Sequence, residues 1–482
     1  MIKMGFGKFD VKKLAGLTQD SRAVKRGFLF AALPGSKMDG RKFIEDAIRN
    51  GASAILAPTG AMLPGGTDDV ELITDDNPRR KLALLAAEFY GSQPGFIAAV
   101  TGTNGKTSTV HFARDLWKLR GLKAASIGTL GVRMGDTVRS GSLTTPDPVS
   151  LQAELADLAA VKVTHLVMEA SSIGLHQHRL DGVQLKAAAY TNLSWDHIDY
   201  HADMDNYFEA KARLFAEVLD KSGTAILNAD TPEFGKLKKL TENHGCHMIS
   251  YGHGGEDIKI ISAQPTPGGK ELKLEVFGKP YEVQFPIVGA FQMMNALCAF
   301  GIVIAEAPDD QEAVDFYAKA LSKLQGPPGR LQLVPGHAKG AAVYVDYAHT
   351  PDALKNVLEA LRPHTTGKLV CVFGCGGDRD RSKRPAMGEI ASKLADTVIV
   401  TDDNPRSENP ESIRKEILKA AAGAKEIGNR REAIQETVKN LGKGDVLVIA
   451  GKGHEQGQIF EDHTEPFDDV TEAAKAIREL KA

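Results

Sequence analysis

Short apolar runs alternate with longer amphipathic runs along most of the chain, and this pattern predicts strands that are each followed by a helix. In the middle of the chain, a predicted strand over residues 96–100 precedes a predicted helix over 110–119. Further strands are predicted near residues 163–168, 187–190 and 225–227. Alternation of this kind is typical of a mostly parallel, doubly wound sheet. The residue-by-residue alternation near 258–285 predicts instead an antiparallel patch appended to that sheet.

Two stretches rich in glycine and proline, residues 91–95 and 326–329, divide the pattern into three segments. The first has predicted strands at 27–32 and 54–57 and predicted helices at 42–50 and 79–90. The third has predicted strands at 342–345, 369–373, 397–400 and 446–450 and predicted helices at 351–361 and 385–394. We therefore expect an α/β protein of three domains: a small N-terminal α/β domain (1–88), a central domain with a mostly parallel sheet (89–326) and an open, Rossmann-like C-terminal domain (327–482).

The composition narrows the class of protein further. The 482 residues are 42% hydrophobic and 25% charged, which is ordinary for a globular protein. A formal net charge of -3 leaves no electrostatic footprint for nucleic acid or an anionic membrane. No apolar run approaches the roughly 18 residues that cross a bilayer, and the N-terminus lacks the apolar core of a secretion signal. The four cysteines are scattered, so zinc and disulfide patterns are weak and a reduced, cytoplasmic enzyme is expected.

The turn from Gly102 to Gly105 has the features of a phosphate-binding loop. It links the predicted strand at 96–100 to the following helix and ends in Lys106 and Thr107. Backbone N–H groups of such a loop, together with the positive end of the helix, face a bound anion. Lys106 adds a full positive charge, and the Thr107 hydroxyl can hold Mg²⁺. The alternative, a glycine turn with a solvated lysine, does not account for the strand–loop–helix context.

Polar clusters also follow other predicted strands of the middle segment. Glu169 ends one strand, where its carboxylate could complete a Mg²⁺ shell or equally well cap the next helix. The loop 191–201 holds two histidines and two aspartates, which favours metal or phosphate chemistry over a merely polar helix start. An amphipathic helix over 207–215 follows, and its Lys211 would ordinarily be interpreted as solvated.

Charged loops follow the predicted strands of the third segment, at the end of an open α/β sheet where ligands bind. The loop 374–384 combines glycines with four cationic side chains, a set that suits phosphate or carboxylate recognition, although a flexible charged turn is the alternative. Asp-Asn-Pro-Arg occurs twice, at 76–79 and 403–406, and either copy could start a helix. Only the second copy belongs to the segment that carries the other charged loops.

These blocks, in this order, resemble the Mur ligases, the ATP-dependent amino-acid ligases of bacterial cell-wall synthesis. The phosphate loop 101–107 is shared with folylpolyglutamate synthetases and marks only the superfamily. More specific blocks lie at 20–22, 35–40, 143–147, 171–179, 346–351 and 451–455. The resemblance covers nearly the whole chain and is closest to the members that extend UDP-N-acetylmuramoyl-L-alanyl-D-glutamate. The motif at 403–406 resembles the recognition motif for meso-diaminopimelate.

The resemblance implies an ADP-forming ligase of cytoplasmic peptidoglycan precursor synthesis. Such an enzyme joins meso-diaminopimelate to the D-glutamate γ-carboxylate of UDP-N-acetylmuramoyl-L-alanyl-D-glutamate through an acyl-phosphate. It implies ATP, Mg²⁺ and CO₂ as a lysine carbamate. It also implies small-molecule substrates as the only partners, with no nucleic acid, no membrane insertion and a monomeric state.

The resemblance assigns roles to individual residues. The residues expected to hold ATP are Gly102, Thr103, Asn104, Gly105, Lys106, Thr107, Ser108, Asn295 and Arg330. The expected catalytic residues are Lys106, Glu169, His197 and Lys211. The expected Mg²⁺ ligands are Thr107, Glu169, His197 and Lys211, the last as N6-carboxylysine. The expected contacts to the UDP-muramoyl-dipeptide are Gln19, Ser21, Ser36, Lys37, Met38, Thr144, Thr145, Ser171, Gln177 and Arg179. The expected contacts to meso-diaminopimelate are Arg379, Asp403, Asn404, Pro405, Arg406, Gly451 and Glu455.

Two positions depart from the family pattern, and several alternatives stay open. Ile173 stands where the family commonly has histidine, and Gln292 stands where it commonly has asparagine. The alternatives within the superfamily are a lysine-adding Mur ligase and a folylpolyglutamate synthetase-like ligase, although the latter has no reason to carry the block 20–40. A P-loop kinase or a nucleotide-dependent switch, which would make no amide, is the alternative from another class.

Overall fold

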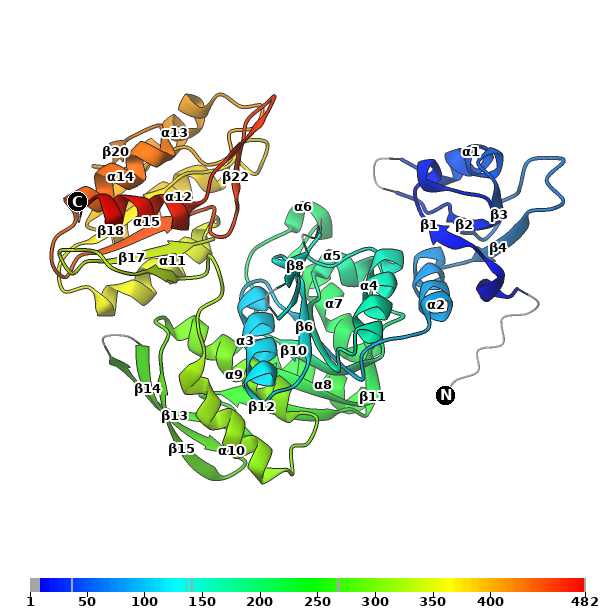
Figure 1. The fold of residues 1–482 in the computed structure, drawn as a ribbon, viewed down its shortest axis with the longest axis horizontal. Helices are drawn as coiled ribbons and strands as arrows, with labels where there is room; N and C mark the ends of the chain where they lie inside the picture. Colours follow the sequence, from blue (N-terminus) through cyan, green and yellow to red (C-terminus); the bar gives the residue numbers. More distant parts are fainter. Residues whose placement is uncertain are drawn as a thin grey trace. The chain divides into compact units, whose positions relative to one another are not determined.

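The computed structural model describes residues 9–35, 38–135, 137–139, 141, 143–266 and 269–480. The chain divides into two compact units. The first comprises Met1–Lys106, Trp117–Leu227 and Thr231–Ile249, and the second comprises Thr107–Leu116, Asn228–Asp230 and Ser250–Ala482. Figure 1 shows strands and helices alternating along the chain, which confirms the predicted α/β class.

The first unit begins with a four-stranded parallel sheet in the order β1-β2-β3-β4. Its strands are β1 (Gly16–Thr18), β2 (Phe28–Ala31), β3 (Ala52–Pro58) and β4 (Glu71–Asp75). Its helices are α1 (Ile44–Arg49) and α2 (Pro78–Tyr90), with 3-10 turns at Val11–Lys13, Ser21–Ala23 and Gly40–Phe43. Asn77 caps the start of α2, where Pro78 occupies the first turn, and Gly91 ends the helix with a φ of 73°.

A larger sheet follows, and within the first unit its strands lie in the order β12-β11-β10-β5-β9-β6-β7-β8. These strands are β5 (Phe96–Thr101), β6 (Ala124–Gly128), β7 (Gly131–Met134), β8 (Thr137–Arg139), β9 (His165–Glu169), β10 (Leu185–Tyr190), β11 (Leu219–Asn228) and β12 (His247–Gly252). The accompanying helices are α3 (Lys106–Leu119), α4 (Pro148–Ala160), α5 (Ser172–His176), α6 (Ile198–His201), α7 (Met204–Arg213) and α8 (Phe234–His244). The last residues of α7 lead into a single π-helical turn, Leu214–Val218.

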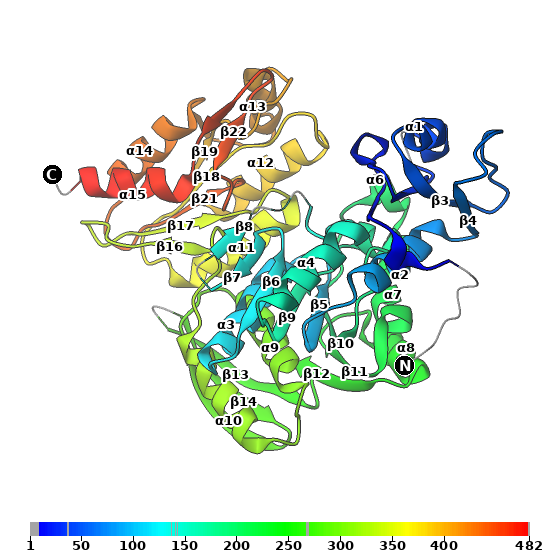
Figure 2. The same ribbon diagram turned by 45° about the vertical axis from the view of Figure 1, so that its right-hand side comes forward.

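Strand β5 lies at the centre of this sheet because its whole side-chain sequence is apolar or small. All six of its residues are buried, and it pairs in parallel with β9 on one side and with β10 on the other. Leu151, Leu155 and Leu158 of α4 share a core cluster with the strands of this sheet. Figure 2 shows α4 beside these strands. The parallel pairing brings the carboxyl ends of β5, β9 and β10 to one edge, where the predicted phosphate loop begins.

The second unit contains the antiparallel patch, which confirms the prediction from residue alternation. β13 (Ile258–Thr266), β14 (Gly269–Val276) and β15 (Lys279–Phe285) pair as consecutive antiparallel strands. β13 also pairs in parallel with the end of β12, at Tyr251 and Ile258. Helices α9 (Ala290–Ile304) and α10 (Gln311–Ala320) follow, and α9 is buried over most of its length.

A six-stranded sheet completes the second unit, in the order β16-β17-β21-β18-β19-β20. Its strands are β16 (Gln332–Val334), β17 (Ala342–Asp346), β18 (Leu369–Phe373), β19 (Thr397–Val400), β20 (Lys425–Glu426) and β21 (Val446–Ala450), and a small hairpin adds β22 (Gly457–Ile459) and β23 (Thr464–Pro466). Its helices are α11 (Pro351–Leu361), α12 (Lys383–Leu394), α13 (Pro410–Leu418), α14 (Arg430–Asn440) and α15 (Asp469–Glu479).

Alternate residues of these strands enter two separate core clusters, one on each face. Val448 of β21 packs in the cluster that includes α11, α12 and α13, whereas its neighbours Leu447 and Ile449 pack in the cluster of α14 and α15. Figure 2 shows the two helix groups on opposite faces of the sheet. This is the doubly wound arrangement, and it directs the loops after β18, β19 and β21 to one edge of the sheet.

The predicted elements differ from the observed ones mainly at their ends. The helix predicted to begin at 110 begins at Lys106, because the lysine and threonine of the phosphate loop already form its first turn. The helix predicted over 42–50 is divided into a 3-10 turn and α1. The predicted domain limits at 88 and 326 stay a prediction.

Candidate active site

The loop between β5 and α3 is held in shape by hydrogen bonds between the Lys106 side chain and its own backbone. The Lys106 ammonium donates to the carbonyl oxygens of Gly102 and Thr103, each at 2.8 Å. Gly102 has a φ of 146°, and a Cβ there would overlap the Thr191 hydroxyl. Gly105 also has a positive φ, at 89°. Both glycines are therefore required by the backbone of the loop.

A second loop, residues 191–194 after β10, holds the phosphate loop in place. The Asn192 side-chain oxygen accepts from the N–H of Asn104 at 2.9 Å, and the Thr191 hydroxyl donates to the Asn104 carbonyl at 2.6 Å. The Thr103 hydroxyl donates to the Ser194 carbonyl at 3.2 Å and accepts from the Ser194 N–H at 3.0 Å. The sequence analysis did not identify these supporting residues. The only feature that could have indicated the contact is that both loops follow predicted strands of one sheet.

Glu169, at the end of β9, is buried at 1% exposure and is held by hydrogen bonds. Its carboxylate accepts from the Thr129 N–H at 2.8 Å and from the Thr129 hydroxyl at 3.2 Å. A Cβ at Gly128 would overlap this carboxylate, so the glycine leaves the space that it occupies. Glu169 does not cap the following helix, because Ser171 does so by accepting from the Gly174 N–H.

The structure brings together five residues predicted to contact the dipeptide end of the nucleotide substrate. The Thr144 hydroxyl lies 3.1 Å from that of Thr129. The Thr145 hydroxyl donates to Ser171 Oγ at 3.1 Å, and the Thr145 carbonyl accepts from Arg179 at 2.6 Å. Arg179 also donates to the Gln177 side-chain oxygen at 2.8 Å. These residues therefore form one polar network with Glu169, whose carbonyl accepts from Thr145 at 2.9 Å.

Asp181 is the ionic centre that fixes the loop 177–179. Its side chain is 4% exposed and its Oδ1 lies 3.0 Å from His178 Nδ1 and 3.3 Å from Arg80 Nε, and it also accepts from Arg213. Burial raises the pKa of the Asp181 carboxyl, but the hydrogen bonds from His178 and Arg213 outweigh it and leave the pKa below the ordinary 3.8. Asp181 therefore joins α2, the substrate-side loop and α7.

Replacing Asp181 with alanine is expected to lower the free energy of unfolding by about 3 kcal/mol, because it leaves Arg213 without its buried partner. The lowered pKa means that the contribution of Asp181 is complete above pH 3.8 and is lost as the pH falls through the folded-state pKa. Urea unfolding at neutral and acidic pH measures both effects. The control is Asp46→Ala, which breaks an exposed pair with Arg49 and should cost less than about 1 kcal/mol. Equal losses for the two variants would contradict this role.

Lys211 lies inside the protein rather than on the solvated face of its helix, so the ordinary interpretation of an amphipathic-helix lysine is wrong here. Its side chain is 1% exposed, and its ammonium lies 4.1 Å from the ring centre of Tyr207. Within the described ranges, no hydrogen bond or ion pair joins this ammonium to a carboxylate. Burial, reinforced by the charge of Lys106, lowers the pKa of Lys211 well below its ordinary value, so its neutral form is more accessible than that of an exposed lysine.

The two histidines of the loop 191–201 differ in their surroundings. His197 is about half exposed, with a φ of 54°, and its Nε2 lies 3.6 Å from Asp196. His201 is buried, and its Nε2 lies 3.0 Å from Ser172 Oγ. Burial, followed by the charges of His176, Lys211 and His197, lowers the pKa of His201 to about 4. His201 is therefore neutral near pH 7, and only His197 is open to a ligand.

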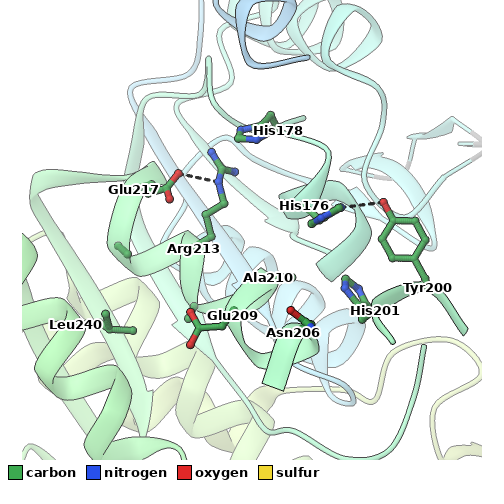
Figure 3. A pocket seen from close by; sticks show the side chains of 12 residues that line it. His176, His178, Tyr200, His201, Asn206, Glu209, Ala210, Arg213, Glu217 and Leu240 are labelled. Atoms are coloured by element: carbon green, nitrogen blue, oxygen red, sulfur yellow. Dashed lines mark hydrogen bonds and ion pairs between the residues drawn. The ribbon is translucent and has the colours of Figure 1, made fainter. Parts of the chain in front are cut away.

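A cavity of about 520 Å³ lies beside α5, α6 and α7. Figure 3 shows His176 hydrogen-bonded to Tyr200 and Arg213 paired with Glu217 among the lining residues. These contacts measure 3.0 and 2.8 Å. The Tyr200 hydroxyl also accepts from Gln177 at 3.1 Å. Except for Gln177, which contacts one of its walls, the predicted substrate residues do not line this cavity.

The predicted uridine-side residues are only partly described. Gln19 is exposed. Ser21 is the first residue of a 3-10 turn that is capped by Asp20, and the Ser21 carbonyl accepts from Asn50 at 3.0 Å. Met38 is 66% exposed, and Ser36 and Lys37 lie outside the described residues. Nearby, the first Asp-Asn-Pro-Arg copy has a structural role, because Asn77 caps α2 and Arg79 donates to the Pro34 carbonyl at 2.5 Å.

In the second unit, Asn295 and Arg330 are joined through Gln292, one of the two positions that depart from the family pattern. The Gln292 side chain is fully buried, donates to the Arg330 carbonyl at 3.2 Å and accepts from Asn295 at 3.2 Å. The Arg330 guanidinium lies 4.4 Å from the ring centre of Tyr347. Glutamine at 292 therefore holds the two predicted nucleotide contacts together. Ile173, the other departure, is a partly buried residue of α5.

The predicted amino-acid contacts gather at the carboxyl ends of β18, β19 and β21. Asn404 donates to Glu455 Oε2 at 2.8 Å, and Arg406 Nη1 donates to the Gly377 carbonyl at 2.8 Å. A Cβ at Gly377 would overlap the Pro405 carbonyl, and one at Gly451 would press on Asp403. The glycines therefore allow the three loops to meet. Arg379 is exposed in the loop 374–384.

The side chains predicted to bind metal can be compared with the ligands that Mg²⁺ prefers. Glu169 offers a buried carboxylate, Thr107 a buried hydroxyl and His197 an exposed imidazole. In the described part of the chain, no group of three or more His, Cys, Asp or Glu side chains is placed to hold a metal ion. Mg²⁺ typically uses one or two carboxylates together with water and phosphate oxygens, so this sparse, oxygen-rich set fits Mg²⁺.

Two further features concern the helices and the cysteines. None of the helices among the described residues is long and apolar enough to cross a membrane. The four cysteines are free thiols, and burial raises the pKa of Cys298, Cys371 and Cys375 to about 12. These three thiols are therefore protonated and packed rather than reactive.

Three family descriptions match successive parts of the chain: the catalytic domain of the Mur ligase family at residues 13–90, the Mur ligase middle domain at 100–303 and the Mur ligase glutamate ligase domain at 329–453. A relative from Caulobacter vibrioides is 50% identical over 475 residues, which cover 97% of this chain and 96% of that protein. A relative from Rhizobium meliloti is 50% identical over 465 residues, covering 96% and 94%. Both carry the name UDP-N-acetylmuramoyl-L-alanyl-D-glutamate–2,6-diaminopimelate ligase.

Solved structures agree with this assignment. A structure of a UDP-N-acetylmuramoyl-L-alanyl-D-glutamate–2,6-diaminopimelate ligase is 35% identical, with a TM-score of 0.71 over 97% of this chain and 96% of that one. A folylpolyglutamate synthase of Mycobacterium tuberculosis is 19% identical, with a TM-score of 0.64 over 83% of this chain and 94% of that one, and shows a shared fold alone.

The chain belongs to the Mur ligase family, and the predicted class of ATP-dependent acid–amino-acid ligase is confirmed. The names of its relatives match the diaminopimelate-adding prediction and neither the lysine-adding nor the folylpolyglutamate alternative.

Proposed function

We propose that this ligase adds meso-diaminopimelate to UDP-N-acetylmuramoyl-L-alanyl-D-glutamate, with ATP converted to ADP and phosphate. The observation that carries the specificity is the meeting of Asn404, Arg406 and Glu455 at one edge of the C-terminal sheet. Diaminopimelate ends in a carboxylate and an ammonium, whereas lysine ends in an ammonium alone. Arg406 pairs with the distal carboxylate, and Glu455 takes the distal ammonium.

The proposed chemistry begins with activation of the D-glutamate γ-carboxylate, which is a poor electrophile. An oxygen of the D-glutamate γ-carboxylate attacks the γ-phosphorus of ATP, the bond to ADP breaks, and an acyl-phosphate forms. The diaminopimelate amine, as the neutral base, then attacks the acyl carbon. A C–N bond forms, inorganic phosphate leaves, and the amine loses a proton. The N–H groups of residues 102–108 and the Lys106 charge stabilise the negative charge that develops on the transferred phosphoryl group.

Mg²⁺ supplies neutralisation of phosphate charge when it is bound. Thr107, Glu169 and His197 would hold it, and the Thr129 hydrogen bonds keep the Glu169 carboxylate in a fixed orientation. Lys211 would contribute as a carbamate, because a neutral buried amine reacts with CO₂ and the product is an anion. Although the charge of Asp196 acts on Lys211, no carboxylate in the described ranges forms a hydrogen bond or ion pair with it, and this supports the proposal.

The remaining residues would bind the other parts of the substrates. Asn295 and Arg330 would contact the adenine nucleotide. The muramoyl-dipeptide would be bound by Thr144, Thr145, Ser171, Gln177 and Arg179, and the uridine side by Gln19, Ser21, Ser36, Lys37 and Met38. All three substrates are small molecules. We propose that the enzyme works as a cytoplasmic monomer.

The experiment that tests this proposal follows one oxygen atom. The γ-carboxylate of the nucleotide substrate is labelled with ¹⁸O, and the enzyme is supplied with ATP, Mg²⁺ and meso-diaminopimelate. One labelled oxygen is expected in the released phosphate, with one ADP formed for each amide. Phosphate without the label, or ADP formed at the same rate without any amino acid, would contradict a ligase that works through an acyl-phosphate.

A further inference from the structure

Among the fully buried cations near the predicted amino-acid contacts are Arg430 and Lys452. Arg430 is satisfied by Asp469, with two hydrogen bonds of 2.7 Å each. It also donates to the carbonyl of Ala450, the last residue of β21, at 2.9 Å. Arg430 is therefore a structural cation that anchors the end of a strand. Lys452 has a different set of partners.

Lys452 contacts two residues of the site itself. Its ammonium donates to the Asn404 side-chain oxygen at 2.8 Å and lies 3.1 Å from Glu455 Oε2. The same Asn404 oxygen accepts from the Ile459 N–H at 3.0 Å, and the Asn404 NH₂ group donates to Glu455 Oε2 at 2.8 Å. Two donors on one side and a carboxylate on the other leave a single orientation for the Asn404 amide.

This arrangement gives the two oxygens of the Glu455 carboxylate different hydrogen bonding. Oε2 accepts from both Lys452 and Asn404, whereas no hydrogen bond to Oε1 occurs among the residues that the structure describes. Glu455 is 33% exposed, so a ligand can reach Oε1. Arg406 Nη1 donates to the Gly377 carbonyl, and the other two guanidinium nitrogens form no hydrogen bond within the described ranges. The cluster therefore offers a ligand both an anionic oxygen, Glu455 Oε1, and one edge of the cationic Arg406 guanidinium.

We propose that Lys452 is a positioning residue for the incoming amino acid, acting through Asn404 and Glu455. It fixes the amide so that its second N–H is available to a carboxylate, and it holds Glu455 so that Oε1 receives an ammonium. The ligand that fits is the far end of an amino acid that carries both groups on one carbon. This inference rests on the proposed function, since it concerns the acceptor of that reaction.

The test compares steady-state constants of the wild-type enzyme and Lys452→Met for all three substrates. The KM for meso-diaminopimelate is expected to rise roughly ten- to hundredfold, as for the loss of a hydrogen bond to a charged group. The KM values for ATP and for the nucleotide substrate are expected to stay within about twofold. The matched control is Lys393→Met, which removes an exposed ammonium from its pair with Glu389 in the same unit and should change none of the three.

A double-mutant cycle separates positioning from a general structural effect. If Lys452 acts through Glu455, the variant Lys452→Met/Glu455→Gln should be no more impaired than the worse single variant. Should Lys452→Met fail to fold, Lys452→Gln replaces it. Its uncharged amide still donates within the cluster, so the expected KM rise is smaller but again confined to meso-diaminopimelate. An unchanged acceptor KM, an equal rise for all three substrates, or additive effects in the cycle would overturn the inference. Wild-type turnover with meso-diaminopimelate is measured first, and its absence would instead contradict the proposed function.

Discussion

Replacing Lys211 with methionine is expected to reduce kcat by roughly a hundred- to thousandfold without destabilising the protein. The catalytic loss follows because methionine cannot form a carbamate, so one preorganised charge of the phosphate site is missing. The stability should stay the same or rise, because the ammonium is 1% exposed and methionine fills the space without any cost of desolvation. Phosphate release and thermal unfolding of the same preparation measure the two effects.

The chemical origin of the effect is tested with labelled bicarbonate. The wild-type enzyme is expected to show a carbamate carbon signal after ¹³C-bicarbonate is added, and Lys211→Met is expected to show none. The exposed Lys415, which pairs with Glu411 on α13, offers the control substitution, and Lys415→Met should keep both activity and signal. A Lys211→Met enzyme with full activity, or one that loses stability in proportion to activity, would contradict the role proposed for Lys211.

Replacing Arg406 with alanine is expected to lower kcat/KM for meso-diaminopimelate by about a hundredfold, because the distal carboxylate loses its cationic partner. The KM for ATP should be unchanged. The loop itself should remain folded, because its backbone is held independently of the guanidinium: the Arg406 N–H donates to the Ile459 carbonyl at 3.0 Å. Steady-state kinetics with meso-diaminopimelate and ATP varied in turn measure the effect.

The control for Arg406 is Arg478→Ala, an exposed arginine on α15 of the same unit. It should leave both constants within about twofold of the wild-type values. The assignment of Arg406 would fail if the affinity for the amino acid were unchanged in Arg406→Ala. It would also fail if the KM for ATP rose as much as that for diaminopimelate.

Many helices and strands of the fold can be predicted from local sequence patterns. The apolar residues 96–100 form the buried β5, and the Gly102–Lys106 turn follows it as predicted. The alternation at 258–285 predicts three antiparallel strands that the structure contains. These predictions succeed because periodicity, glycine and helix-start residues act within a few positions of one another.

Side-chain environments proved less predictable. The burial of Lys211 depends on the packing of α7 against the phosphate loop side of the sheet, and an amphipathic helix alone does not reveal it. The support given by Asn192 and Ser194 requires β10 to lie next to β5, which is a matter of strand order. Lys452 is a lysine among glycines, and only the fold shows that it is fully buried against Asn404.

The most direct test of the account is a competition for one enzyme. Purified protein is supplied with ATP, Mg²⁺, UDP-N-acetylmuramoyl-L-alanyl-D-glutamate and equal amounts of meso-diaminopimelate and L-lysine, and the nucleotide product is identified by mass. The expected product contains diaminopimelate almost exclusively. A product that contains lysine would contradict the role of Asn404, Arg406 and Glu455, and the absence of any tripeptide product would contradict the proposed reaction.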